Sequence, residues 1–183
     1  DMYDMLGSVV QSVQAHCVFP TPEEFELMSR RKKLWVAHCP QSNMNANGVA
    51  APIRRYLDAG IHVGLGTDIA GSNTLSMFRT ISDTIVASKI YWNSMERKGD
   101  PFAEKTYLTV SEAFYLATKG GCSFWGKAGS FEEGSLFDAV VIDDAPLWDF
   151  NNRSLRQRIE RVVFQGDERH TVAKFINGRK VYG

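Results

Sequence analysis

Short apolar runs alternate with longer amphipathic segments through the first two thirds of the chain. Three of these runs, at 13–16, 34–38 and 61–66, contain small or β-branched residues and stop at polar loops. Short apolar runs bounded by turns predict buried strands, and strands that alternate with helices predict a parallel sheet. We therefore expect three consecutive strand-to-helix units.

Helix signals lie between these runs. Thr21 to Glu24 combine a capping hydroxyl, a proline at the first helical position and a glutamate three residues after the cap, so a helix should begin there and run to about Lys33. The segment 39–50 is rich in Asn, Ser and Gly and is predicted to be a polar loop. Residues 52–58 should form a short helix that Gly60 closes.

A long amphipathic helix is predicted over 75–95, followed by a polar connection at 96–106. Its buried face should carry Met77, Phe78, Ile81 and Ile85. A second capping pattern at Thr109 predicts a helix through Ala117, which Gly120 and Gly121 end.

The pattern changes to short runs from Leu136 onward. Strands are predicted at 136–142, 161–164, 171–176 and 179–183. The last two flank Asn177-Gly178, the strongest two-residue hairpin signal. We assign residues 1–130 to the strand-to-helix units and residues 131–183 to a small β unit, a portion of a β-sandwich.

Composition narrows the function. The 183 residues are 44% hydrophobic, which suffices for a sizeable core, and the 21 basic and 21 acidic residues leave no net field to attract nucleic acid. No apolar run is long enough to cross a bilayer, and three irregularly spaced cysteines suit a reducing compartment. We expect a cytoplasmic protein with a small-molecule substrate and no nucleic-acid or membrane partner. Because the chain starts at Asp1 without a methionine, we also expect it to be part of a longer polypeptide.

Chemically useful side chains end the predicted strands. His16 ends the first strand, His38 ends the second, and Asp68 follows the third within the stretch 61–71. In a barrel of parallel strands these positions converge on one mouth, where catalytic groups lie. Imidazole and carboxylate are ordinary zinc ligands, and a catalytic site leaves one position open for water. His16 and Asp68 are therefore the candidate metal ligands.

A structural metal site is the alternative. It would use His16, Cys17, His38 and Cys39. Successive side chains on a strand point to opposite faces, so His16 and Cys17 should not share one ion, and this geometry disfavours the alternative.

Simpler interpretations of single residues also remain. A strand-end histidine is often a hydrogen-bonded core residue, and Gly66-Thr67-Asp68 could be a turn. His62 begins its strand and His170 lies in a polar connection, so both should be structural. Four aromatic residues should belong to the core: Phe114, Tyr115, Phe124 and Trp125.

Several motifs together resemble a known family. They are AHCVFPTPEE, VAHCPQSN, PIRRYLDAGIHVGLGTDIAG followed by SMF, and, in the tail, LFDAVVID and NGRKV. Over nearly the whole chain these motifs resemble the C-terminal half of the guanine deaminases, within the metal-dependent amidohydrolase superfamily.

The resemblance implies an α/β fold, namely the C-terminal part of a (β/α)8 TIM-like barrel, strands 6 to 8, with a small flanking β unit. It also implies that His16 and Asp68 bind zinc or another divalent metal such as iron, and that Asp68 is catalytic because it transfers protons. His38 and Asn43 match the pocket loop that binds the substrate. The implied reaction is hydrolysis of guanine to xanthine and ammonia by a homodimer.

Other parts of the family's site are missing from the chain. They are a His-x-His pair on the first strand, a histidine on the fifth, and a glutamate that shuttles protons. Since a catalytic zinc commonly has about three protein ligands, the chain alone should be inactive, and residues upstream of Asp1 should supply the rest. Two alternatives stay open: another amidohydrolase that acts on an aminopurine, pyrimidine or triazine, and a non-catalytic module that retains the fold.

Overall fold

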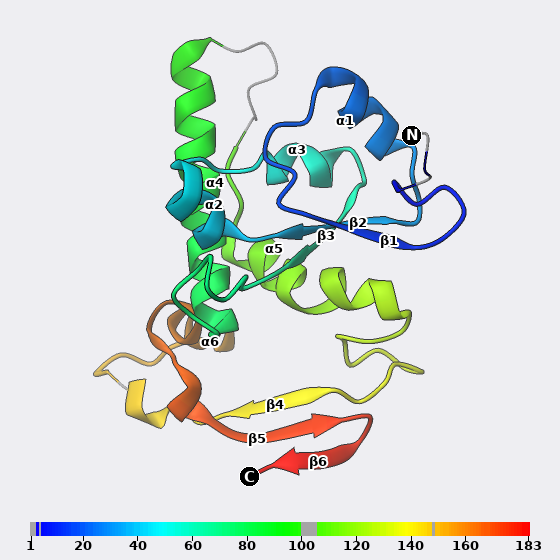
Figure 1. Ribbon diagram of the computed structural model, residues 1–183. Coiled ribbons are helices and arrows are strands. Elements are labelled where there is room, and N and C mark those ends of the chain that lie inside the picture. Colours follow the sequence, from blue (N-terminus) through cyan, green and yellow to red (C-terminus); the bar gives the residue numbers. More distant parts are fainter. Residues whose placement is uncertain (1–2, 4, 100–105, 148) are drawn as a thin grey trace.

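Three parallel strands form the first sheet of the computed structural model shown in Figure 1. The structure describes residues 3, 5–99, 106–147 and 149–183. The strands, in spatial order, are β1 (Ser12–Ala15), β2 (Leu34–His38) and β3 (His62–Leu65). Ser12 pairs with Leu34, and Trp35 pairs with His62. A helix follows each strand, so the predicted strand-to-helix units are confirmed, and the fold is mixed α/β.

The helix α1 (Pro22–Ser29) begins at the predicted capping box. The Thr21 hydroxyl accepts from the Glu24 N–H, and the Glu24 carboxylate accepts from the Thr21 N–H. The helix ends at Ser29, one turn before the predicted Lys33. The helix α3 (Ile53–Asp58) ends as predicted, and Gly60 follows with a φ of 71°, which glycine adopts without steric cost.

The predicted loop at 39–50 is wrong, because Pro40–Asn47 form a helix, α2. Its asparagines are poor helix formers, and no side chain caps its start. A proline at its first position and the left-handed Gly48 at its end favour the helix, and Ser42 and Asn43 are buried by the surrounding structure. Tertiary packing therefore outweighs local propensity here.

The main core lies between the sheet and the helices α1 and α3. Figure 1 shows these two helices on one side of the sheet and α5 on the other. The buried cluster comprises Met28, Leu34, Val36, Ala51, Ile53, Tyr56, Ile61, Val63, Leu108 and Leu116. Alternate residues of β2, Leu34 and Val36, thus face the helices.

The long helix α4 (Met77–Lys98) follows β3. Ile81 and Ile85 are buried as predicted and Phe78 is partly buried, but Met77 is exposed, so the predicted face is wrong at its first residue. The helix also takes in residues 96–98 of the predicted connection. Residues 100–105 of that connection lie outside the described residues.

The helix α5 (Val110–Tyr115) begins at the second predicted capping box, formed by Thr109 and Glu112. It continues into a π-helical turn, η1 (Leu116–Gly120), beyond the predicted end. This turn lies against β3, where a Cβ on Gly120 would be 3.0 Å from the Val63 carbonyl oxygen. Glycine therefore permits the close approach.

The aromatic residues expected in the core are only partly there. Phe114 and Phe124 are partly buried, whereas Tyr115 and Trp125 are exposed, so the prediction is wrong for the latter two. Their helical segments present one side to the solvent, and a pattern of aromatic residues alone does not identify that side. Short 3₁₀ turns complete this part and the tail: Ser123–Trp125, Ala145–Leu147 and Glu168–His170.

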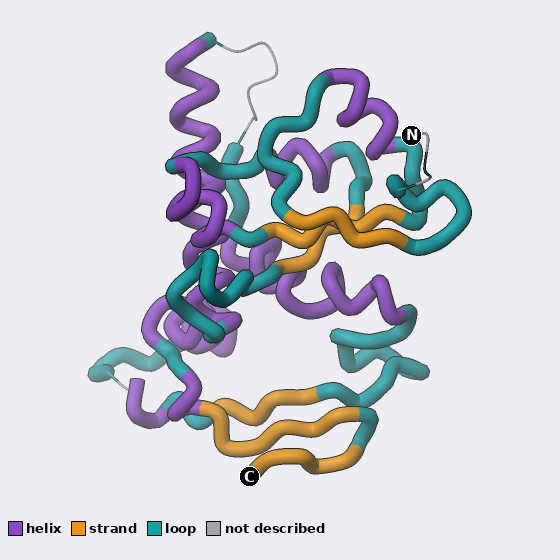
Figure 2. Tube along the Cα trace, in the orientation of Figure 1, coloured by secondary structure: helices purple, strands orange, loops and turns teal. Residues whose placement is uncertain are grey.

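A second, antiparallel sheet follows, and α5 lies between the two sheets (Figure 2). The strands of this second sheet, in spatial order, are β4 (Ala139–Ile142), β5 (Thr171–Ile176) and β6 (Arg179–Tyr182). Asn177 and Gly178 both have positive φ and join β5 to β6, so the predicted hairpin is confirmed.

The predicted strand at 161–164 is wrong, because it lies within the helix α6 (Leu155–Gln165). A short apolar run does not distinguish a strand from a buried helix segment. The decisive signal is the capping box of Ser154 and Gln157, which starts the helix upstream of the run. Val163 packs with Ile81 of α4, so α6 joins the tail to the first unit.

Candidate functional site

The carboxyl ends of β1 and β3 bring His16 and Asp68 together. The His16 N–H donates to the Ala37 carbonyl oxygen at 2.9 Å, which extends the pairing of β1 with β2 by one residue. Nε2 of His16 lies 3.8 Å from Oδ2 of Asp68. The predicted approach of these two side chains is confirmed.

Both residues have a left-handed backbone. The φ angle is 68° at His16 and 48° at Asp68, a region that residues other than glycine rarely adopt. Such conformations persist only where the surroundings fix them, and they concentrate at functional sites. The Ser72 N–H donates to the Asp68 carbonyl oxygen at 2.7 Å, so the turn that carries the carboxylate is held by its own backbone.

Gly71 leaves room for the Asp68 carboxylate. A Cβ at this position would lie 2.7 Å from both Asp68 Oδ2 and Ser42 Oγ. The Asn45 side chain of α2 donates to the Gly71 carbonyl oxygen at 3.2 Å. The unpredicted helix α2 thus packs against the turn and holds it in place.

Cys39 is the functional candidate that the sequence analysis did not place with His16 and Asp68. One ligand atom from each of the three residues lies within 4.8 Å of the others. Burial, and then the charge of Asp68, raise the pKa of the buried Cys39 thiol to about 11, so it is protonated at neutral pH. Gly66 makes space for the thiol, because a Cβ there would be 3.0 Å from Sγ.

The alternative four-ligand site is not formed in the described part of the chain. The group that comes together contains Cys39 but neither Cys17 nor His38. The Cys17 thiol instead donates to the Gln14 carbonyl oxygen. Cys17 follows His16 in the sequence, but its thiol does not join the group of possible ligands.

His38 is buried beside this group. It is 1% exposed, and burial followed by the charge of His16 lowers its pKa to about 3, so the ring is neutral at pH 7. Its Nδ1 makes no hydrogen bond with the described residues. A buried, unpaired ring nitrogen is costly unless a ligand or water bonds it.

Asn43 contacts His16 directly. Its Oδ1 lies 2.8 Å from Nδ1 of His16, and the residue is 4% exposed. The amide oxygen therefore joins α2 to the loop after β1, and the NH₂ group has no partner among the described residues.

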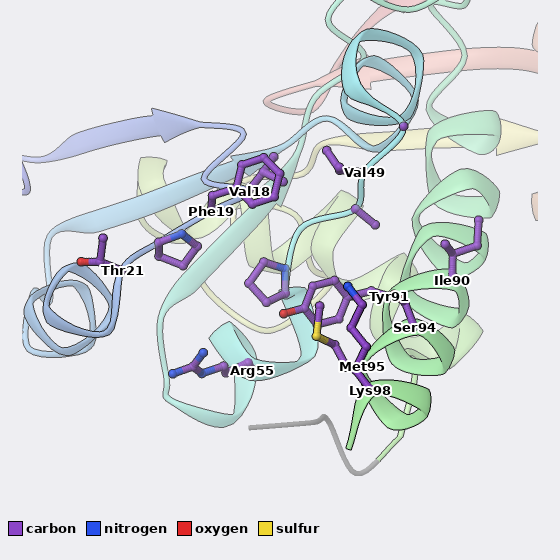
Figure 3. Close-up of a pocket in the computed structure, with 14 residues that line it drawn as sticks. Val18, Phe19, Thr21, Val49, Arg55, Ile90, Tyr91, Ser94, Met95 and Lys98 are labelled. Carbon is purple, nitrogen blue, oxygen red and sulfur yellow. The ribbon is translucent and has the colours of Figure 1, made fainter. Parts of the chain in front are cut away.

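Two cavities lie away from these residues. One of about 490 Å³ is bordered by the loop around Phe19, the segment after α2 and the end of α4 with Tyr91 and Lys98 (Figure 3). Another of about 310 Å³ lies along the sheet and is bordered by Trp35 and Trp125. Neither is lined by His16 or Asp68.

The donor set suits a divalent transition metal. Histidine nitrogen, carboxylate oxygen and cysteine sulfur are the groups that bind zinc in proteins. Here the atoms converge without rearrangement of the backbone.

Within the described residues, no helix is both long and apolar enough to span a membrane.

His16, Cys39 and Asp68 lie together at the carboxyl ends of parallel strands, which is where α/β enzymes have their active sites. The sequence profile of the amidohydrolase family matches residues 3–181, and the chain belongs to this family. It is 32% identical to a guanine deaminase of Dictyostelium discoideum over 178 residues, which are 93% of this chain and 38% of that protein.

Solved structures extend the comparison. A guanine deaminase from C. acetobutylicum with guanine bound in the active site superposes with a TM-score of 0.88, at 38% identity, over 100% of this chain and 41% of that one. An atrazine chlorohydrolase from Arthrobacter aurescens complexed with zinc gives a TM-score of 0.71 at 25% identity, over 93% of this chain and 36% of that one. The chain therefore spans about two fifths of the length of the relatives it matches.

Proposed function

We propose that this chain is the C-terminal part of a metal-dependent aminohydrolase that converts guanine to xanthine and ammonia. The observation that carries the proposal is the convergence of His16 and Asp68 at the carboxyl ends of β1 and β3. The similarity to guanine deaminases over nearly the whole chain supports guanine as the substrate. Closure of the barrel would need strands from outside this chain, since a full barrel takes about 250 residues.

His16 and Asp68 would hold the metal ion, with zinc or iron as the proposed identity. A bound divalent ion supplies hydroxide at neutral pH, because it lowers the pKa of its water to about 7. Two ligands are fewer than the roughly three of a catalytic zinc site. The remaining ligands would come from residues outside this chain.

Asp68 would accept the proton of the attacking water and pass it to the departing amino group. The new C–O bond forms at the ring carbon that carries the amine, the C–N bond breaks, and ammonia leaves. His38 and Asn43 would bind the substrate. His38 is neutral and its Nδ1 is unpaired, and Asn43 has a free amide N–H for a purine acceptor.

Two further assignments belong to the same proposal. Residues 1–130 would form the barrel part and residues 131–183 the flanking β unit, since the parallel sheet lies in the first range and the antiparallel sheet in the second. The complete protein would act as a homodimer in the cytoplasm.

The test is ammonia release by the purified complete protein, stripped of metal and reloaded with zinc or iron. We expect one xanthine and one ammonia per guanine, and a kcat/KM for guanine at least tenfold above that for adenine, cytosine and an aminotriazine. Cytosine and the triazine represent the alternative substrate classes. Metal-loaded protein that prefers one of them, or that releases no ammonia from guanine, would contradict the proposal.

A further inference from the structure

We propose that Tyr56 is a positioning residue, whose hydroxyl holds the strained turn that places the His16 ring beside Asp68. The inference rests on the proposed function for the reaction at this site, and it holds whatever partner the imidazole takes there. Tyr56 is 0% exposed and lies in α3, so it would act through the backbone next to His16 and not through contact with the substrate.

The turn after β1 is strained. His16 lies at the centre of a three-residue turn, in which the Cys17 N–H donates to the Ala15 carbonyl oxygen at 2.9 Å. Since the φ angle of the central residue is 68°, this is a γ-turn of the rare, strained type. Cys17 follows with a φ of 43°, so two consecutive residues other than glycine have a left-handed backbone. Such a turn persists only where neighbouring groups fix it.

Tyr56 supplies a group that fixes the turn. Its hydroxyl donates to the Cys17 carbonyl oxygen at 2.6 Å, a bond between residues 39 positions apart. The direction of this carbonyl depends on the backbone angles of the two left-handed residues. Without the hydroxyl the turn can relax toward the ordinary negative φ, and the His16 ring would then move away from Asp68.

Tyr56 is itself held firmly. Its side chain belongs to the main core, and its ring stacks with that of Phe25 in α1, with the centroids 6.0 Å apart. Its carbonyl oxygen accepts from the N–H of Ile61, the residue directly before β3, at 2.9 Å. Burial raises the pKa of Tyr56, so the hydroxyl keeps its proton and stays a donor at neutral pH. One residue therefore bonds to the loop after β1 and to the start of β3, the two strands whose ends carry the site.

The alternative is a purely structural role, because a buried hydroxyl that bonds a carbonyl stabilises a fold wherever it lies. Thr84 offers the comparison. It is also 0% exposed, and its hydroxyl donates to the Thr80 carbonyl oxygen at 2.8 Å within α4. Tyr56→Phe and Thr84→Val each remove one buried hydroxyl and keep the shape of the side chain. The two variants therefore separate positioning of His16 from general stability.

The experiment first compares guanine deamination by the complete protein and its variants. Tyr56→Phe should lower kcat about 10- to 100-fold, because a misplacement of about 1 Å at a reaction site can cost that much. Thr84→Val should change kcat less than about twofold. Adding Cys17→Gly to Tyr56→Phe should restore kcat to about a third of the wild-type value or more, since glycine adopts a positive φ without steric cost.

Hydrogen exchange follows the turn itself. It is measured by mass spectrometry on a peptide that covers residues 12–20 of the metal-free protein, so it needs neither metal nor substrate. The Cys17 amide, which bonds to Ala15, should exchange at least about tenfold faster in Tyr56→Phe than in the wild type. Thr84→Val should exchange this amide at the wild-type rate.

Wild-type kcat or wild-type exchange in Tyr56→Phe would overturn the inference. So would an equal loss of kcat in Thr84→Val, or a loss that Cys17→Gly does not restore. If Tyr56→Phe does not fold, the double variant decides: a folded protein with restored kcat supports the inference, and a slow or unfolded one overturns it. A wild type that releases no ammonia from guanine contradicts the proposed function alone, and the exchange rates then decide the inference.

Discussion

The two sheets of the chain differ in how they are covered. In the first sheet Leu34, Val36 and Val63 are buried under α1 and α3, and the strand ends carry His16 and Asp68. In the second sheet apolar residues stay in contact with solvent: Val140 is 53% exposed and Val181 is 50% exposed.

The difference explains where chemistry can be placed. A site needs side chains held within fractions of an ångström, and packing from neighbouring elements provides that precision. The turn after β3 has such support from α2, through the bond between Asn45 and Gly71. Within the described residues, β6 pairs with β5 as the edge strand of its sheet, and all four of its residues are exposed.

The largest expected effect is a difference in kcat between two variants, each of which removes one carboxylate: Asp68 after the first sheet and Asp144 in the tail. Asp68→Asn should lower kcat for guanine about 10²- to 10⁴-fold in the complete protein, because the variant keeps the shape but loses the proton acceptor that we propose. Asp144→Asn, which removes a carboxylate paired with Arg158 in the tail, should change kcat less than about twofold. Ammonia release and metal content are measured together. An Asp68→Asn protein that keeps its metal and turns over at a near-normal rate would disprove the role of Asp68.

The next comparison concerns stability. Leu34→Ala removes a fully buried side chain and should lower the free energy of unfolding of the complete protein by about 3 kcal/mol. Val181→Ala should cost less than about 0.5 kcal/mol, since Val181 is half exposed. Urea unfolding gives both values. A Val181→Ala cost above about 2 kcal/mol would show that this sheet is covered in the complete protein.

A smaller effect tests the helix that replaces the predicted strand at 161–164. Ser154→Ala removes the side-chain cap of α6 and should cost about 1 kcal/mol. Ser111→Ala changes an exposed serine inside α5 that caps nothing, so its cost should be near zero. Equal unfolding free energies for the two variants would contradict the capping role of Ser154.

The smallest effect is a pH dependence at the ion pair of Arg54 and Glu112, which joins α3 to α5 at 2.6 Å. Burial acts to raise the pKa of Glu112, but hydrogen bonds from Arg54 and Thr109 outweigh it and lower the pKa. The pair therefore stabilises the fold above the unfolded pKa of about 4.3, and this stability is lost as the pH falls through the lowered folded value. Because Glu112 is partly exposed, we expect less than about 1 kcal/mol.

Glu112→Gln is the control for that pH dependence. Its unfolding free energy should fall less steeply than that of the wild type between pH 5 and pH 3. Parallel curves for the two proteins would show that Glu112 does not contribute.

The sequence predicts what local signals determine. The capping boxes at Thr21 and Thr109 and the Asn177-Gly178 turn act over four residues or fewer, so their positions are correct. The helix α2 is missed because its Asn-rich sequence is stabilised by burial. The run at 161–164 is misassigned because its apolar spacing fits both a strand and a helix.

The residues of the candidate site also divide into those that local signals predict and those that depend on the packing of distant segments. The approach of His16 to Asp68 follows from their places at strand ends, which the sequence indicates. The contact between Asn43 and His16 depends on the missed helix and spans 27 residues, so no local pattern signals it. Cys39 directly follows β2, and no local pattern signals that its thiol lies with His16 and Asp68.

The most direct test of the account is a crystal structure of the complete, metal-loaded protein, with anomalous diffraction recorded at the absorption edge of the metal. We predict one ion within about 2.0–2.2 Å of both Nε2 of His16 and a carboxylate oxygen of Asp68. An ion bound elsewhere, or one that contacts only one of these two side chains in an active protein, would contradict the central claim.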